Sequence, residues 1–340
     1  MKFVDVESVE PGQVLGRTIF SSNGMVLLSA GVQLTVYMIS TLKRLGVTVV
    51  YLDDPNYRDI EHEDVLSEET KRVVIGQMSE TFEALRSGKP FNTKAISQSV
   101  DMLLDDVMRN QNLLVQLGDI RTADNAMFLH AMNVCMMASL LGLNMGLNML
   151  QLKELAIGAL LHDIGKLDAP EVQEGRTHHA WRGFEIMKTK REYSLLSAHV
   201  AFQHHEHVDG TGQPRGLTSE EIHPFAKITA VANLYDNLVF GAGGEPPLQP
   251  HVAIEKLNAL SGTALDHETL VQFMRIVSVY PNGVSVRLSN KLVGVVVGQH
   301  RGLPGRPVVR VIDKEDDSAV AAQEIDLSQQ TTLFIEEVLR

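Results

Sequence analysis

Residues 161–166 read LHDIGK, and residues 203–214 read QHHEHVDGTGQP. Histidines concentrate around these two stretches: the chain has 13, and nine of them lie between His130 and His223. A neutral imidazole is the side chain that most often binds transition metals in proteins. We therefore expect a histidine-based metal site that includes His162, Asp163, His204 and His205.

The sequence around these histidines is mostly helix-patterned. Helices are expected over about 124–143, 149–162 and 224–240, with Asp124 as a candidate N-cap of the first. Further donors fall on these segments or between them, namely His130, His179 and Asn233. Several imidazoles with one carboxylate suit Fe, Mn, Zn, Co or Ni rather than Ca or Mg alone.

The order of these motifs resembles the HD-GYP branch of the HD superfamily, over about residues 118–275. The resemblance rests on His130, HDIGK at 162–166, HAWRG at 179–183, HHEHVDGTGQP at 204–214 and AKITAVANLYDNL at 226–238. It implies an all-α domain with a dinuclear metal centre. It also implies hydrolysis of cyclic di-GMP to the linear dinucleotide, and often further to GMP.

The resemblance also assigns roles by position. One divalent metal ion would be held by His130, His162 and Asp163, and a second by Asp163, His179, His204 and His205. The matching catalytic residues are Asp163 and Lys166. Substrate contacts would come from Lys166, Gly212, Gln213 and Pro214. Two such ions, with Fe or Mn expected before Zn, Co or Ni, can activate water and clamp a phosphodiester.

The sequence departs from the family pattern at four places. Asn233 stands where the family has a metal-binding Asp, and Ala126 where some members have a Glu for a third metal. Gln213 replaces the aromatic residue of the GYP signature, and residues 240–248 lack the usual basic RPYR-like segment. Three functions stay open: first a cyclic di-GMP phosphodiesterase, then a non-hydrolytic binding or signalling module, then a phosphohydrolase acting on another nucleotide.

Polar residues next to the motifs have more ordinary interpretations. His178 competes with His179 as a ligand, although the spacing favours His179. Glu206 could orient a ligand histidine or face solvent, and we favour the first. We expect Asp209 to form a turn before Gly210. Asp236 lies one helical turn beyond Asn233 and matches a different family position.

The expected fold class is mainly α. An HD-type helical bundle over 118–275 would carry an N-terminal α+β module (1–60), a helical connector (61–117) and a β-rich extension (276–340). In the module we expect strands at 25–28 and 47–52 around a helix at 35–45, ended by Gly46.

In the connector, one helix begins after Ser67 and another spans about 93–117. The apolar stripe of the second helix favours packing within its own domain, with a homodimer contact as the alternative. Further strands are expected at 284–288, 292–297 and 307–312.

The composition limits the classes of partner and the cellular compartment that we expect for this protein. With 30 Lys and Arg against 42 Asp and Glu, the net charge is −12, which argues against binding to DNA or to anionic membranes. The single cysteine, Cys135, excludes an internal disulfide and fits a reducing compartment and a buried position. No signal peptide or apolar run of about 18 residues is apparent. We expect a cytoplasmic protein with a cyclic dinucleotide as substrate and with signalling proteins as partners.

Overall fold

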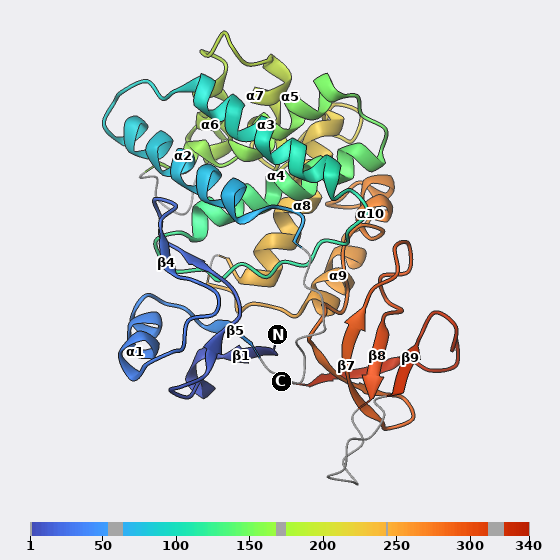
Figure 1. The fold of residues 1–340 in the computed structure, drawn as a ribbon. Helices are drawn as coiled ribbons and strands as arrows, with labels where there is room; N and C mark the ends of the chain where they lie inside the picture. The colour runs from blue at the N-terminus through green and yellow to red at the C-terminus, as the bar shows by residue number, and fades with distance from the viewer. Residues whose placement is uncertain (1, 54–63, 168–174, 243, 312–322, 340) are drawn as a thin grey trace.

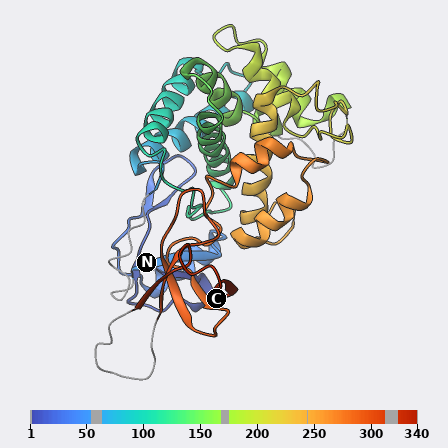
Figure 2. The ribbon, with the colours of Figure 1, turned by 90° about the vertical axis from the view of Figure 1, so that its right-hand side faces the viewer.

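The computed structural model describes residues 2–53, 64–167, 175–242, 244–311 and 323–339. It has three parts: an N-terminal α/β module, a helical bundle and a C-terminal antiparallel sheet (Figure 1). Both small parts lie at the same end of the bundle (Figures 1 and 2). The expected fold class is therefore confirmed, whereas the boundary expected between residues 60 and 61 falls outside the described residues.

The N-terminal module forms two small sheets and one helix. Its strands are β1 (Lys2–Asp5), β2 (Val14–Leu15), β3 (Ile19–Phe20), β4 (Val26–Leu28) and β5 (Val49–Asp53). The three-stranded sheet has the order β1-β5-β2, and β3 pairs with β4. Helix α1 (Val36–Arg44) begins at its N-cap Thr35, and Gly46 follows with φ 80°. Such a left-handed conformation favours glycine, as predicted.

The bundle surrounds one largely apolar helix, α4. Its helices are α2 (Glu68–Arg86), α3 (Thr93–Arg109), α4 (Ala126–Asn144), α5 (Met149–Leu160), α6 (His179–Met187), α7 (Leu195–Gln203), α8 (Pro224–Phe240), α9 (Pro250–Ala259) and α10 (His267–Phe273). Among the described helices, α4 alone is long and apolar enough to cross a membrane, but 83% of that window is buried inside the protein. Core packing explains its composition, and Cys135 on α4 is fully buried as expected.

The second connector helix is shorter than predicted. α3 ends at Arg109 rather than near Leu117. Beyond it, the Val115 amide donates to the Ile276 carbonyl at 2.7 Å, and Val115 forms a bridge with Val277. The apolar stripe of α3 is buried in the bundle of the same chain, which removes the surface proposed for a homodimer.

Two helix ends near the histidines also differ from the prediction. Asn125, not Asp124, is the N-cap of α4. Its side chain makes no capping hydrogen bond to the helix, and its Nδ2 donates to the Phe20 carbonyl at 2.7 Å. α5 ends at Leu160, before His162. The earlier end places His162 and Asp163 in the turn just beyond the helix.

The C-terminal part is a five-stranded antiparallel sheet in the order β10-β6-β7-β8-β9. Its strands are β6 (Ser285–Leu288), β7 (Val293–Gly298), β8 (Val308–Val311), β9 (Gln323–Asp326) and β10 (Ile335–Leu339). Alternating burial along β6 and β8 gives the sheet one apolar face. The first three strands were predicted. The last two were missed because their sequences, QEID and IEEVL, lack the run of β-branched residues that marked the others.

Candidate metal centre

Two of the histidines follow directly on helix ends. The last carbonyls of a helix have no partner within it. His162 Nδ1 donates to the Ala159 carbonyl at 2.7 Å, and His204 Nδ1 donates to the Ala201 carbonyl at 2.9 Å. Because a carbonyl can only accept, each Nδ1 carries the proton and each Nε2 keeps a lone pair. The helix ends therefore prepare both rings as cation ligands.

A third histidine comes from the second turn of α4. His130 Nδ1 lies 2.6 Å from Asp236 Oδ2 on α8, and Asp236 is fully buried. This carboxylate sets the same tautomer in His130 that the carbonyls set in the other two rings. This contact between Asp236 and His130 was not predicted from the sequence. Its position three residues after Asn233, on the same helix face, was the available signal.

The Nε2 atoms of these rings point at one another. The distance between Nε2 atoms is 3.2 Å for His130 and His162, 3.2 Å for His179 and His204, and 3.1 Å for His179 and His205. Desolvation by burial lowers the pKa of His162 to about 3, so its ring is neutral. In the pair of His130 and His162, each ring carries its proton on Nδ1, so the lone pairs of the two Nε2 atoms face each other. Two such donors fit a cation bound between them.

Asp163 stands between the two histidine groups. Its Oδ2 is 3.6 Å from His130 Nε2 and 3.5 Å from His162 Nε2. Its Oδ1 is 3.3 Å from His179 Nε2 and 3.5 Å from His204 Nε2. Oδ1 is buried without a hydrogen-bond partner in the described structure. Burial opposes ionisation, yet Lys166 and then His162 hold the pKa of Asp163 well below its usual range.

The six predicted histidine and aspartate ligands thus form two groups that share Asp163. We call His130, His162 and Asp163 the His130 half, and we call Asp163, His179, His204 and His205 the His179 half. The ligand atoms within each half all lie within 4.8 Å of one another. Asp163 offers Oδ2 to the His130 half and Oδ1 to the His179 half, as a carboxylate does when it bridges two metals. Asn233 belongs to neither group: it is buried, and its Oδ1 accepts a hydrogen bond from Asn237 Nδ2 at 3.0 Å.

The predicted substrate contacts lie at the edge of this centre. Lys166 Nζ is 2.6 Å from Asp163 Oδ2, and its side chain is 41% exposed, so the ammonium group can reach a ligand from solvent. The Gln213 amide donates to the His205 carbonyl at 3.0 Å, which ties the 212–214 turn to the His179 half. A Cβ on Gly212 would overlap the backbone at Glu206 and His207.

The neighbouring polar residues are mostly structural. The prediction for Glu206 was wrong: its carboxylate accepts from the Arg215 and Leu217 amides, both at 2.8 Å, and so holds the loop rather than a histidine. Asp209 accepts from the Thr211 amide at 2.9 Å, as predicted for a turn. His178 caps α6, with its ring stacked on His179 at 4.4 Å between centroids.

Comparison with known protein families decides the class of this bundle. Residues 119–269 match the model described as an HD domain. This segment is an HD domain. Residues 285–340 match a second model, described as a KOW domain associated with HD domain, so the five-stranded sheet is KOW-like.

Three proteins similar to this chain are named as phosphodiesterases. It is 29% identical over 71% of its length to a cyclic di-GMP phosphodiesterase of Pseudomonas aeruginosa, covering 60% of that protein. A cyclic di-GMP phosphodiesterase of Thermotoga maritima is 29% identical over 51% of this chain and 49% of its own length. A 3'3'-cGAMP-specific phosphodiesterase of Vibrio cholerae is 31% identical over 36% of this chain and 29% of its own. The chain therefore spans about three fifths or less of these relatives.

Among solved structures, an HDG"Y"P protein of Bdellovibrio bacteriovorus matches with a TM-score of 0.49 at 18% identity. The match covers 80% of this chain and 97% of that one.

The buried histidines predict a pH dependence for the metal-free protein. In the unfolded chain His162 binds a proton near pH 6.5, whereas in the folded protein its pKa is about 3. Unfolding therefore takes up a proton between these values, and His162 alone lowers the free energy of unfolding by about 1.4 kcal/mol for each pH unit below 6.5. Above pH 6.5 its contribution is constant. The depressed pKa of Asp163 adds a further loss only below its unfolded value of 3.8.

Urea unfolding of chelator-treated protein at about pH 7.5 and about pH 5.5 measures this dependence. The matched variant His162→Asn should show a shallower dependence. Equal stability of the wild-type protein at both pH values would contradict the prediction.

Proposed function

We propose that the HD domain is a metal-dependent phosphodiesterase whose substrate is cyclic di-GMP. The observation that carries this proposal is the position of Asp163, whose two oxygens face different histidine groups. The names of the two relatives from Pseudomonas aeruginosa and Thermotoga maritima support the substrate. We also propose a cytoplasmic location, supported by the lone buried cysteine, and signalling proteins as partners.

The side chains present fit two divalent metal ions, Fe or Mn before Zn, Co or Ni. The His130 half would hold one ion and the His179 half the other. When bound, such a pair supplies Lewis-acid charge and an activated water for in-line displacement at phosphorus. The rings of His162, His204 and His130 keep their orientation because Ala159, Ala201 and Asp236 accept their Nδ1 protons.

Lys166 has a separate role in the proposal. Its ammonium group is partly exposed beside the centre, where it can donate to a phosphate oxygen as negative charge develops. In the present structure it pairs with Asp163 Oδ2. Binding of a phosphodiester would offer Lys166 a second anionic partner. The 212–214 turn supplies an exposed Gln213 next to His205 for contacts to the rest of the ligand.

A second candidate function is a module that binds a cyclic dinucleotide without hydrolysing it. Asn233 favours it, because an amide brings no charge to a metal and its oxygen already accepts from Asn237. The sequence from Phe240 to Leu248 also lacks Lys and Arg to hold a phosphate. A third candidate function is the hydrolysis of another cyclic dinucleotide, 3'3'-cGAMP, which the name of the Vibrio cholerae relative suggests.

Metal content and turnover of the wild-type chain and Asn233→Asp test the proposal. We expect about two metals per chain after reconstitution with Fe or Mn, hydrolysis of cyclic di-GMP, and an affinity of the His130 half that rises about 10-fold in Asn233→Asp. Asn258→Asp, at an exposed position on α9, is the matched control and should change neither. If the two-metal protein leaves cyclic di-GMP intact, the proposal fails. Cleavage of 3'3'-cGAMP alone would favour the third candidate, and tight binding without turnover the second.

A further inference from the structure

We propose that Arg17 and Arg121 are positioning residues of the metal centre, and that the docked N-terminal module thereby determines how well the His130 half binds metal. Both act through a row of buried and partly buried charges that ends at His130. We call this row the charge ladder; its members are Arg17, Asp64, Lys71, Asp119, Arg121 and Asp236. The inference rests on the proposed metal centre and is independent of the substrate.

The ladder begins at the metal ligand. Asp236 Oδ2 holds His130 Nδ1 at 2.6 Å, and its Oδ1 accepts from Arg121 Nη2, also at 2.6 Å. The guanidinium of Arg121 also lies over the Phe240 ring, with Cζ 3.5 Å from the centroid. Two residues of α8, Asp236 and Phe240, therefore fix the position of the Arg121 side chain. Because both carboxylate oxygens of Asp236 are engaged, a change at Arg121 changes the orientation of the group that orients His130.

The middle of the ladder runs beside α4. Asn133 lies one helical turn after His130, between Asp119 and Arg121. In the amide orientation that satisfies both neighbours, its nitrogen donates to Asp119 Oδ2 at 3.0 Å and its oxygen accepts from Arg121 Nη2 at 3.2 Å. Lys71 Nζ then joins Asp119 Oδ1 at 2.8 Å to Asp64 Oδ2 at 3.0 Å.

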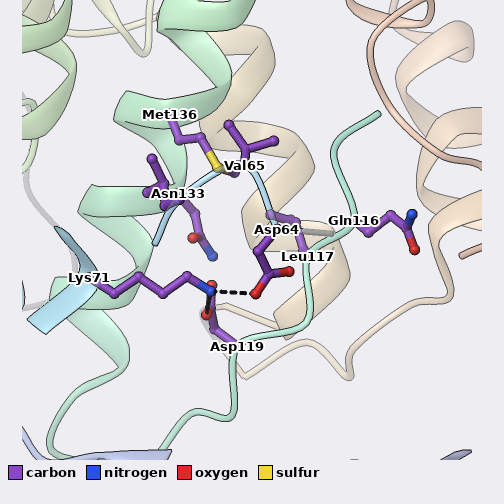
Figure 3. A pocket seen from close by; sticks show the side chains of 9 residues that line it. Asp64, Val65, Lys71, Gln116, Leu117, Asp119, Asn133 and Met136 are labelled. Atoms are coloured by element: carbon purple, nitrogen blue, oxygen red, sulfur yellow. Dashed lines mark hydrogen bonds and ion pairs between the residues drawn. The ribbon is translucent and has the colours of Figure 1, made fainter. Parts of the chain in front are cut away.

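Figure 3 shows Lys71 extended toward the two carboxylates, with Asn133 pointing to the same region from α4. The cavity that these side chains line has a volume of about 10 Å³, roughly room for one water molecule. The Lys71 and Asp119 side chains are 9% and 13% exposed, whereas that of Asp64 is 31% exposed. Water therefore screens these ion pairs only in part, and each depends on its neighbours.

The far end of the ladder belongs to the N-terminal module. Arg17, between β2 and β3, pairs with Asp64 at 3.0 Å, and its Cζ lies 4.8 Å from the centroid of the Tyr51 ring. The module is held close to the bundle near this point. A Cβ on Gly24 would overlap the Arg72 carbonyl of α2.

The charges along the ladder alternate in sign: three cations stand between or beside three carboxylates. Loss of one cation leaves a carboxylate with one partner fewer, and its neighbours reorganise to compensate. At Arg121 this carboxylate is Asp236, which keeps only its contacts to His130 and α4. At Arg17 it is Asp64, which keeps Lys71, for which Asp119 competes. The first change acts on the partner of His130 directly. The second reaches Asp236 only through five further contacts, by way of Lys71, Asp119, Asn133 and Arg121, so its effect should be smaller.

Titration of the metal-free full chain with Co(II) tests this proposal. Elemental analysis gives the number of ions bound per chain, and visible absorption gives the Co(II) affinity of each half. We expect two bound ions in the wild type. Arg121→Gln should weaken the His130 half about 10- to 100-fold while the His179 half keeps its affinity. Arg17→Gln should weaken the same half by a smaller factor. Lys43→Gln is the matched control, because Lys43 forms an exposed ion pair with Glu7 in the same module.

The conservative variant Arg17→Lys separates positioning from folding. Weaker binding in Arg17→Gln that recovers in Arg17→Lys supports the proposal even if Arg121→Gln does not fold. Wild-type affinity of the His130 half in Arg17→Gln and in folded Arg121→Gln would overturn it and leave the proposed function intact. An equal loss from both halves would also overturn it, since that indicates general destabilisation. A wild-type chain that binds no Co(II) would overturn both this proposal and the metal centre.

Discussion

Replacing Asp163 by Asn is expected to empty both halves of the metal centre and to lower phosphodiesterase activity by about 10³-fold or more. The side chain keeps its shape but loses its charge and one of its two acceptor oxygens. Each half then retains only imidazole ligands, because Asp163 is the one carboxylate among the ligands of either half. No single histidine variant should have this effect, since each histidine belongs to one half.

Elemental analysis and the cyclic di-GMP assay measure both parts of this prediction. Asp101→Asn is the matched control, because Asp101 pairs with Lys153 on the exposed surface of α3. It should keep about two metals per chain and full activity. An Asp163→Asn protein that still binds two metals would show that Asp163 does not join the halves.

Gly165→Ala is expected to disable the His179 half although it replaces none of the ligand side chains. Gly165 lies in the short 3-10 helix η3 (Ile164–Lys166), which faces α6. A Cβ at this position would overlap the His179 carbonyl and lie 2.6 Å from the Gly183 nitrogen. Both obstacles are backbone atoms, which cannot rotate away as a side chain would. α6 must shift, and His179 moves with it, away from Asp163 Oδ1 at 3.3 Å.

We expect this overlap to lower the free energy of unfolding by about 1–3 kcal/mol and to leave one tightly bound metal instead of two. Urea unfolding and Co(II) titration give the two quantities. Gly305→Ala is the matched control: its Cβ would meet no atom within 4 Å, and its φ is not positive. A Gly165→Ala chain with two tightly bound metals and wild-type stability would contradict the close approach of η3 to α6.

Local sequence signals predicted those elements whose ends depend on local chemistry. α8 begins at Pro224 and ends before Gly241, as predicted, and Ser67 caps α2. α3 was predicted too long because the chain after Arg109 keeps an apolar pattern. That pattern serves a pairing with Val277, far along the chain. A single stretch of sequence does not contain the partner that ends such a helix.

The sequence by itself determined the ligand types and their order along the chain. The HD and HH pairs follow helix-patterned segments, and unpaired carbonyls at a helix end orient a following histidine locally. Only the tertiary structure decided which rings share an Asp163 oxygen, that Asp236 rather than Asn233 contacts His130, and that Arg17 reaches the bundle. These contacts join residues from separate helices and from the N-terminal module. Their geometry depends on how the helices pack, because no local pattern specifies which distant side chain will face a given position.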